Sequence, residues 1–152
     1  MREFAERLRE IASEIEAEQV AGRQMTIILV KPSEHGIQLS RNFRAGEFAC
    51  RSGIAGILIH KDLLEGLQRM RDMIGKPIRI TSGYRCYEHN VAVDGAENSM
   101  HMWGKAADVV VNGMTGDDIA TVARQVGGFN GIGIGANMCH VDVRKTPATW
   151  RY

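Results

Sequence analysis

The segment SMHMWGKAAD at residues 99–108, together with HVD at residues 140–142, decides how this chain folds and what it binds. The two segments carry two histidines, His101 and His140, and two carboxylates, Asp108 and Asp142. A catalytic zinc ion takes three such nitrogen or oxygen ligands from the protein and keeps a fourth position open. The two segments can therefore supply a zinc site, with one carboxylate to spare.

The residues around these acids predict buried strands. Side chains alternate between the two faces of a strand, so His140 and Asp142 share one face. Residues 106–111 are apolar apart from Asp108, which indicates a buried strand that carries a single acid. A buried carboxylate without a partner costs several kcal/mol, and a cation held jointly with His101 and His140 would remove that cost.

The remaining hydrophobic patterns predict an α+β domain in which helices and strands are mixed and strands concentrate toward the end of the chain. Helices are expected over residues 2–19, 63–73 and 116–126, and strands over residues 25–30, 78–81, 106–111, 131–135 and 139–143. Gly75 and Pro77 close the second helix, and Thr115 is expected to cap the third. Residues 86–104 are predicted to form a long functional loop.

Length and composition indicate one domain with an ordinary core. The chain has 152 residues, a formal net charge of +1 and 44% hydrophobic residues. The low charge argues against a nucleic-acid partner. No run of 18 apolar residues predicts a membrane span, and the charged first 19 residues lack the core of a signal peptide. Three cysteines at irregular spacing do not predict a disulfide framework.

The chain resembles the zinc D-Ala-D-Ala carboxypeptidases and murein peptidases that share the Hedgehog-like fold. The resemblance covers roughly residues 39–150, including LS-x-NF at 39–43 and EF at 47–48. The matching residues are Ile80-Thr81-Ser82-Gly83-Tyr84-Arg85, Asn90, Gly95-Ala96, Ser99-x-His101-x-x-Gly104-x-Ala106-x-Asp108 and His140-Val141-Asp142. The resemblance implies that residues 36–152 form the zinc peptidase domain, with a small antiparallel sheet that carries the zinc site and is flanked by helices. Residues 1–35 are expected to form an appendage, whose amphipathic helix could pair two chains into a weak homodimer.

The resemblance implies a role for each matching residue. His101, Asp108 and His140 would bind one zinc ion, which supplies activated water for attack on an amide carbonyl. Arg85 would act in catalysis and bind the substrate by its terminal carboxylate or polarised carbonyl oxygen. Ser99 and Asn90 would support the loop and the substrate.

The general base is the unsettled part of this prediction. Several branches of the family place a carboxylate three residues before the last histidine ligand, and this chain has Asn137 there. Asp142 is the remaining catalytic candidate, since it shares a strand face with His140. It could equally orient a histidine ligand instead of moving a proton. A further departure is Asp94, which stands where the family has a second glycine.

Three other readings compete with the zinc peptidase. Cys86, His89, Cys139 and His140 could close a structural zinc site, although adjacent strand residues point to opposite faces. The chain could be a non-catalytic, metal-containing binding module for cell wall or protein with the same fold. A nucleophilic hydrolase built on Cys139 and His140 is disfavoured by the same divergence.

The predicted activity is hydrolysis of an amide bond involving a D-amino acid, in the stem peptides or cross-links of peptidoglycan. This substrate lies outside the membrane, whereas the sequence predicts synthesis in the cytoplasm without a signal peptide. A phage or prophage enzyme that reaches the wall by another route would reconcile the two expectations.

Overall fold

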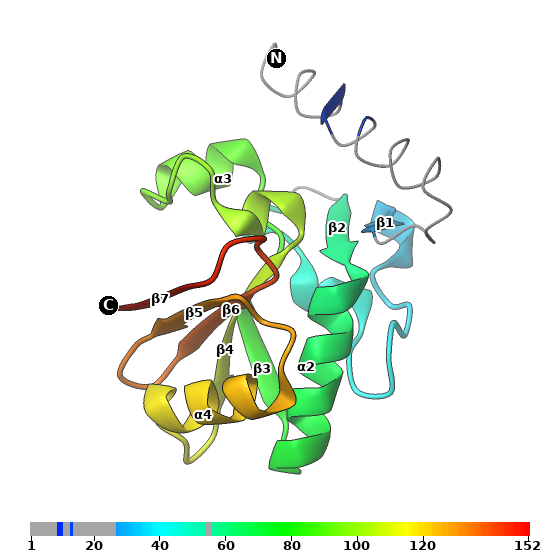
Figure 1. Cartoon of the computed structure of the whole chain (residues 1–152). Helices are drawn as coiled ribbons and strands as arrows, with labels where there is room; N and C mark the ends of the chain where they lie inside the picture. The colour runs from blue at the N-terminus through cyan, green and yellow to red at the C-terminus, as the bar shows by residue number, and fades with distance from the viewer. Residues whose placement is uncertain (1–8, 11–12, 14–26, 54–55) are drawn as a thin grey trace.

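A five-stranded sheet in the order β3-β4-β6-β5-β7 organises the molecule (Figure 1). The computed structural model describes residues 9–10, 13, 27–53 and 56–152. The strands are β1 (Ile27–Val30), β2 (Ile57–His60), β3 (Ile78–Ser82), β4 (Ala106–Val111), β5 (Gly131–Ile134), β6 (Cys139–Asp142) and β7 (Ala148–Arg151). The helices are α2 (Lys61–Ile74), α3 (Tyr87–Ala92) and α4 (Gly116–Val126), with 3-10 turns η1 (Pro32–Glu34), η2 (Ala45–Phe48) and η3 (Met100–Trp103). The α+β prediction is confirmed; the Hedgehog-like assignment stays a prediction.

The sheet differs from the predicted antiparallel one at its edge. Strands β3, β4, β6 and β5 pair antiparallel, but β5 and β7 pair in parallel. After β6 the chain reverses direction and crosses to the far edge of β5. Strand β7 is therefore antiparallel to β6 and parallel to β5. Sequence patterns did not predict β7, because its four residues, ATWR, contain only two apolar side chains, which is a weak strand signal. The sheet is therefore mixed.

A second, two-stranded sheet pairs β1 with β2 antiparallel, with Ile27 opposite His60. The β1 prediction is confirmed within residues 27–30, whereas β2 was missed because its apolar run leads directly into helix α2. The amphipathic helix predicted over residues 2–19 lies almost entirely outside the described residues. The domain boundary at residue 36 stays a prediction.

Helices α2 and α4 cover one face of the large sheet and form the core with it (Figure 1). The predicted stripe of α2 is buried at Leu63, Leu67 and Met70, while Met73 at its end is exposed. Gly75 ends α2 in the left-handed conformation, as expected. The predicted loop over residues 86–104 contains α3 and η3, whose six and four residues are too short for a periodic pattern.

The opposite sheet face is left for polar residues. On β4 and β6, Val109, Cys139 and Val141 point into the core, so Asp108, His140 and Asp142 point the other way. No described helix is long and apolar enough to span a membrane. The polar face is where the predicted site residues meet.

Candidate metal centre

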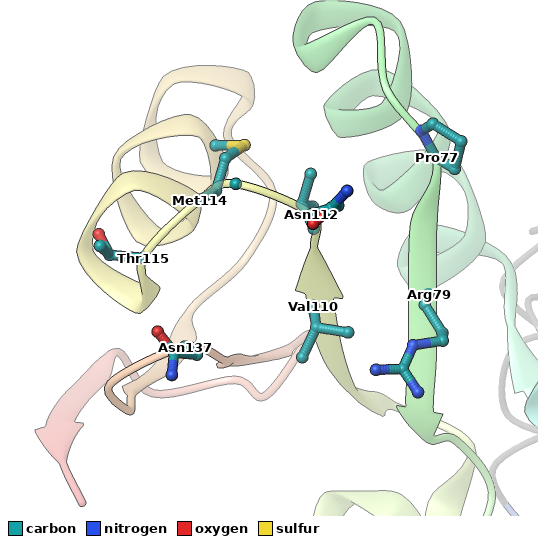
Figure 2. A pocket seen from close by; sticks show the side chains of 9 residues that line it. Pro77, Arg79, Val110, Asn112, Met114, Thr115 and Asn137 are labelled. Carbon is teal, nitrogen blue, oxygen red and sulfur yellow. The ribbon is translucent and has the colours of Figure 1, made fainter.

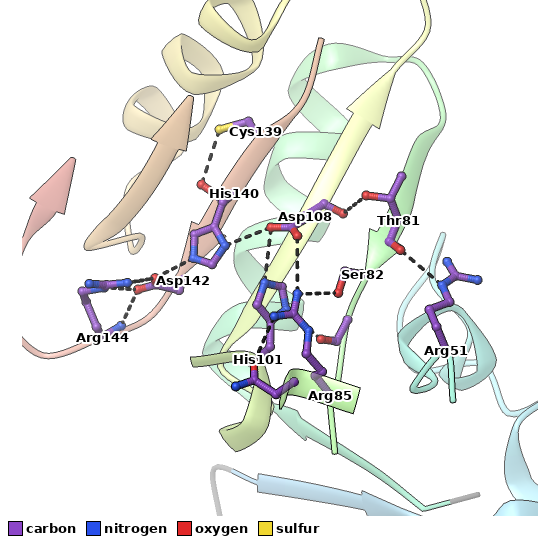
Figure 3. Close-up of polar contacts among 12 residues, drawn as sticks. Arg51, Thr81, Ser82, Arg85, His101, Asp108, Cys139, His140, Asp142 and Arg144 are labelled. Carbon is purple, nitrogen blue, oxygen red and sulfur yellow. Dashed lines mark hydrogen bonds and ion pairs between the residues drawn. The ribbon is translucent and has the colours of Figure 1, made fainter. Parts of the chain in front are cut away.

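The three predicted ligand residues come together on this polar face (Figure 3). Asp108 and His140 are opposite one another in the β4–β6 ladder, and η3 places His101 beside them. One ligand atom from each residue lies within 4.8 Å of the other two. Gly104 ends η3 with φ 67°, and a Cβ there would collide with the Leu58 carbonyl, so this close turn requires glycine.

The ring of His101 is held by the backbone. Its Nδ1 lies 2.8 Å from the carbonyl oxygen of Gly83. Because a carbonyl oxygen only accepts hydrogen bonds, Nδ1 must carry the proton and donate it. In a neutral ring this leaves the lone pair on Nε2, which lies 3.3 Å from Asp108 Oδ1. His101 is therefore oriented to offer Nε2 to a cation.

His140 is held in the same manner by a carboxylate. Its Nε2 lies 2.7 Å from Asp142 Oδ2, while its Nδ1 lies 2.9 Å from Asp108 Oδ1. Arg144 binds both oxygens of Asp142 through its side chain, and its backbone N–H donates to Oδ1. Asp142 is 0% exposed. The pair with Asp142 leaves Nδ1 of His140 facing Asp108.

These contacts fit a zinc ion. A histidine that ligates a metal donates its other ring N–H to a carbonyl or carboxylate, as both rings do here. Two imidazole nitrogens and one carboxylate are also a donor set of catalytic zinc sites. Burial raises the pKa of Asp108, but hydrogen bonds with His101 and His140 outweigh burial and hold the pKa well below its usual range. Asp108 is thus kept as a carboxylate.

The glycines of β5 make room for the buried pair. Gly131 lies opposite Asp142, and a Cβ at Gly131 would overlap the Asp142 carboxylate. A Cβ at Gly133 would meet the indole of Trp150, whose ring lies 5.1 Å from that of His140. The GIG sequence of β5 therefore lets both the carboxylate and the indole approach His140.

Arg85 lies at the edge of the same cluster. Its guanidinium donates to Asn90 Oδ1 and Ser82 Oγ, each at 3.1 Å, and lies 3.9 Å from Asp108 Oδ2. Its Nε is buried without a hydrogen-bond partner, which no other side-chain nitrogen or oxygen of the described residues shares. A buried donor without a hydrogen-bond partner is rare in proteins and calls for a specific explanation.

The two predicted supporting residues lie beside Arg85. Asn90 is buried on α3, accepts from Arg85 and donates to the carbonyl of Ala96 at 2.9 Å. Ser99 precedes η3 and lines a cleft of about 840 Å³, which also contains Arg85 and the three candidate ligands. Asn90 therefore positions the arginine and the loop, while Ser99 faces the cleft.

The carboxylates that line this cleft are Asp94 and Asp108. Asp94 has φ 54°, in the left-handed region where glycine is favoured and aspartate is tolerated. Asn137 lies elsewhere: it lines a separate hollow of about 700 Å³ with Arg79 and Thr115 (Figure 2). The position that carries a base in several family branches therefore does not line the cleft here.

The rival structural zinc site is not assembled. Cys139 points into the core from the opposite face of β6, and Cys86 lies beside Cys50. Among the described residues, His101, Asp108 and His140 form the one group of three or more with metal-binding proximity. Burial raises the pKa of Cys139 to about 12, so this thiol stays protonated and is a poor nucleophile.

A centre of two histidines and one aspartate in a cleft is typical of metallohydrolases, and sequence comparison identifies the family. Residues 38–143 match the Peptidase M15 family model, so the chain belongs to the M15 peptidases. Over 62 residues it is 42% identical to the zinc D-Ala-D-Ala carboxypeptidase of Streptomyces albus G. The match covers 40% of this chain but only 24% of that relative.

Two groups that contribute to the site were not predicted from the sequence. Arg144, which anchors Asp142, follows it by two residues, but an exposed-looking arginine after a strand carries no distinguishing signal. The carbonyl of Gly83 that orients His101 is a backbone group and has no signal in a sequence at all. The acid at position 94 was visible as a departure from glycine, but its place in the cleft was not.

Proposed function

We propose that this chain is a zinc-dependent peptidase that hydrolyses amide bonds involving D-amino acids in peptidoglycan stem peptides or cross-links. The observation that carries the proposal is the His101–Asp108–His140 cluster, whose two rings are already oriented for a metal by Gly83 and Asp142. Membership in the M15 peptidases supports hydrolysis of a peptide, and the name of the Streptomyces albus G relative supports zinc and D-alanine.

We assign the zinc ligands to His101 Nε2, Asp108 and His140 Nδ1. Zinc bound there supplies Lewis-acid chemistry, polarising an amide carbonyl and making water acidic. The residues of the chain do the rest. Arg85 presents a guanidinium and the unpartnered Nε–H to a substrate carboxylate or carbonyl oxygen, with Asn90 and Ser82 holding the side chain. Ser99 contributes a polar lining to the cleft.

We propose that Asp142 positions His140 and is not the general base. Its oxygens are engaged by His140 and Arg144, and it is fully buried away from the cleft lining. The carboxylate that lines the cleft besides Asp108 is Asp94, so we assign proton transfer to Asp94. Asp94→Asn should then lower kcat about 10²-fold or more while zinc content stays the same. An unchanged kcat would remove Asp94 from the mechanism.

The proposal is tested with purified, zinc-loaded full chain and defined muropeptides, analysed by mass spectrometry. Release of terminal D-alanine indicates a carboxypeptidase, and conversion of cross-linked dimers to monomers indicates an endopeptidase. His140→Ala should abolish release, whereas His89→Ala, a histidine outside the cluster, should retain it. If the wild type released no more product from the muropeptides than His140→Ala does, the peptidase proposal would be overturned and a non-catalytic binding module would be favoured.

The same pair of variants tests the rival zinc site. His89 belongs to the rival set of Cys86, His89, Cys139 and His140, but not to the candidate centre. Zinc content should fall in His140→Ala and stay at one ion per chain in His89→Ala. Loss of zinc from both variants would contradict the assignment of ligands.

The location of action also belongs to this proposal. Peptidoglycan lies outside the cytoplasmic membrane, so the enzyme is proposed to act at the cell wall. We propose that a phage or prophage carries it there, and the genes beside its own would test this. Neighbouring wall-synthesis genes without phage genes would contradict the proposal.

A further inference from the structure

Two of the three cysteines, Cys50 and Cys86, lie against one another. The Sγ atoms of Cys50 and Cys86 are 3.3 Å apart, although the residues are 36 positions apart in the sequence. Both residues are buried, at 4% and 5% exposure, and neither is in a disulfide. The hydroxyl of Ser52 lies 3.2 Å from Cys50 Sγ and 3.3 Å from Cys86 Sγ.

Backbone contacts on both sides hold the two thiols in place. The N–H of Tyr84 donates to the Phe48 carbonyl at 2.8 Å, so the chain before Cys50 lies against the chain before Cys86. Arg51 donates to the carbonyls of Thr81 and Ile80 at the end of β3 (Figure 3). The N–H of Cys86 itself donates to Cys50 Sγ at 3.3 Å. The approach of the sulfurs therefore follows from the fold.

The two thiols differ in the direction in which the fold shifts their pKa. Burial raises the pKa of Cys50, but hydrogen bonds from Ser52 and from the Cys86 N–H outweigh it and lower the pKa overall. Burial is also the largest influence on Cys86 and leaves its pKa above the ordinary value. Since the thiolate is the nucleophile in thiol–disulfide exchange, the lower pKa favours Cys50 as the attacking thiol.

We propose that Cys50 and Cys86 form a reversible disulfide by exchange with a low-molecular-weight disulfide. The Cys50 thiolate attacks one sulfur of that disulfide, forms a mixed disulfide and expels one small thiolate. Cys86 then loses its proton and attacks the Cys50 sulfur, which expels the second small thiolate. Two protein thiols are oxidised, and one small disulfide is reduced to two thiols.

The bond would fasten the segment that carries the substrate-binding arginine. Cys86 directly follows Arg85, and its carbonyl accepts from the N–H of Asn90 in the first turn of α3. A link to Cys50 would therefore tie Arg85 and Asn90 to the chain beside β3. Under the proposed function, the oxidising surroundings of the cell wall would favour this linked form.

The test compares full-length chain equilibrated with oxidised glutathione against chain kept in reduced glutathione. After removal of the glutathione and denaturation, thiol titration should find one free thiol in the oxidised sample and three in the reduced one, since the chain has three cysteines. Peptide mapping should show a link between the Cys50 and Cys86 peptides. The oxidised sample should unfold roughly 5–10 °C higher, because the link constrains the unfolded chain.

Single cysteine variants show which residues form the disulfide. Cys50→Ser and Cys86→Ser should each lose the redox-dependent shift in unfolding temperature, whereas Cys139→Ala should keep it. Three free thiols in the oxidised sample, a link that involves Cys139, or an equal shift in Cys50→Ser would overturn the proposal. None of these measurements requires hydrolysis, so a chain that proves inactive on peptidoglycan leaves this test intact.

Discussion

At the scale of single residues, the two aspartates of the site, Asp108 and Asp142, differ in exposure and in contacts, although each lies next to a histidine. Asp108 lies between His101, His140 and Arg85 and is 16% exposed at its side chain. Asp142 is fully enclosed by His140, Arg144 and the backbone of β5. Asp108 is thus available to bind a metal, whereas Asp142 is buried and contacts the candidate ligand His140 and its own neighbours.

The positioning role of Asp142 leads to a prediction about metal affinity. Asp142→Asn keeps an oxygen near His140 but loses the charge that pairs with Arg144, so zinc affinity should fall about 10–100-fold. Competition with a fluorescent zinc chelator measures this. Asp117→Asn, which breaks the exposed pair with Arg151, is the matched control and should leave affinity unchanged. Unchanged affinity with lost hydrolysis in Asp142→Asn would instead favour its role as general base.

At the scale of elements, strand β5 shapes the site although it supplies none of the predicted site side chains. Its alternating glycines face the polar side, while Ile132 and Ile134 face the core. One face of β5 therefore carries isoleucine side chains that pack in the core, and the other face carries no side chains. This arrangement lets Asp142 and Trp150 approach the backbone of β5.

The bare face of β5 is tested by adding one methyl group. Gly131→Ala places a Cβ where the Asp142 carboxylate lies, so it should destabilise the fold by roughly 1–3 kcal/mol and weaken zinc binding. Gly36→Ala is the control, because a Cβ at Gly36 meets nothing within 4 Å. Denaturant unfolding of both variants measures the difference. Equal stability of the two variants would contradict the crowding of Asp142.

Helix α4 begins with the predicted cap. The N–H of Asp118 donates to Thr115 Oγ at 3.2 Å, and the N–H of Thr115 donates to Asp118 Oδ2 at 2.9 Å. These bonds from the backbone and hydroxyl of Thr115 lower the pKa of Asp118. A carboxyl with a lowered pKa stabilises the fold above its unfolded pKa, about 3.9, and this contribution is lost as pH falls through the folded pKa.

Removing the hydroxyl tests this cap. Thr115→Ala should destabilise the protein by about 1 kcal/mol near neutral pH. The pKa of Asp118, followed by NMR, should move up toward its ordinary value, and Thr121→Ala in the same helix should leave it unchanged. A pKa that does not move in Thr115→Ala would contradict the capping contacts.

At the scale of the whole molecule, the candidate ligands come from η3, β4 and β6, so a bound metal ties these segments together. Zinc at about 1,000 times its dissociation constant should stabilise the folded chain by about 4 kcal/mol. For a chain of this size the thermal midpoint should rise by roughly 10 °C, and a chelator should reverse the rise. His140→Ala should show no zinc-dependent shift, whereas a shift as large as in the wild type would contradict the ligand set.

Local patterns predicted most of the fold, and the failures have physical causes. Helices α2 and α4 were visible because three or more turns repeat one apolar stripe and end in glycine. Strand β2 was missed because its apolar run leads directly into helix α2, and β7 was missed because two apolar residues in four are a weak strand signal. The parallel pairing of β7 with β5 depends on which strand of the sheet still has unpaired backbone groups when β7 joins it. The residues of β7 do not specify that strand.

For the site, the sequence by itself determined which residue types stand at which spacing, and therefore that two histidines and an aspartate could share a cation. Alternation along β4 and β6 is a property of the local backbone, so it placed Asp108, His140 and Asp142 on predictable faces. Only the tertiary structure decided what each group touches. The contacts of Asp142 with Arg144, His101 with Gly83, and Cys50 with Cys86 depend on how separate segments pack, which local patterns do not contain.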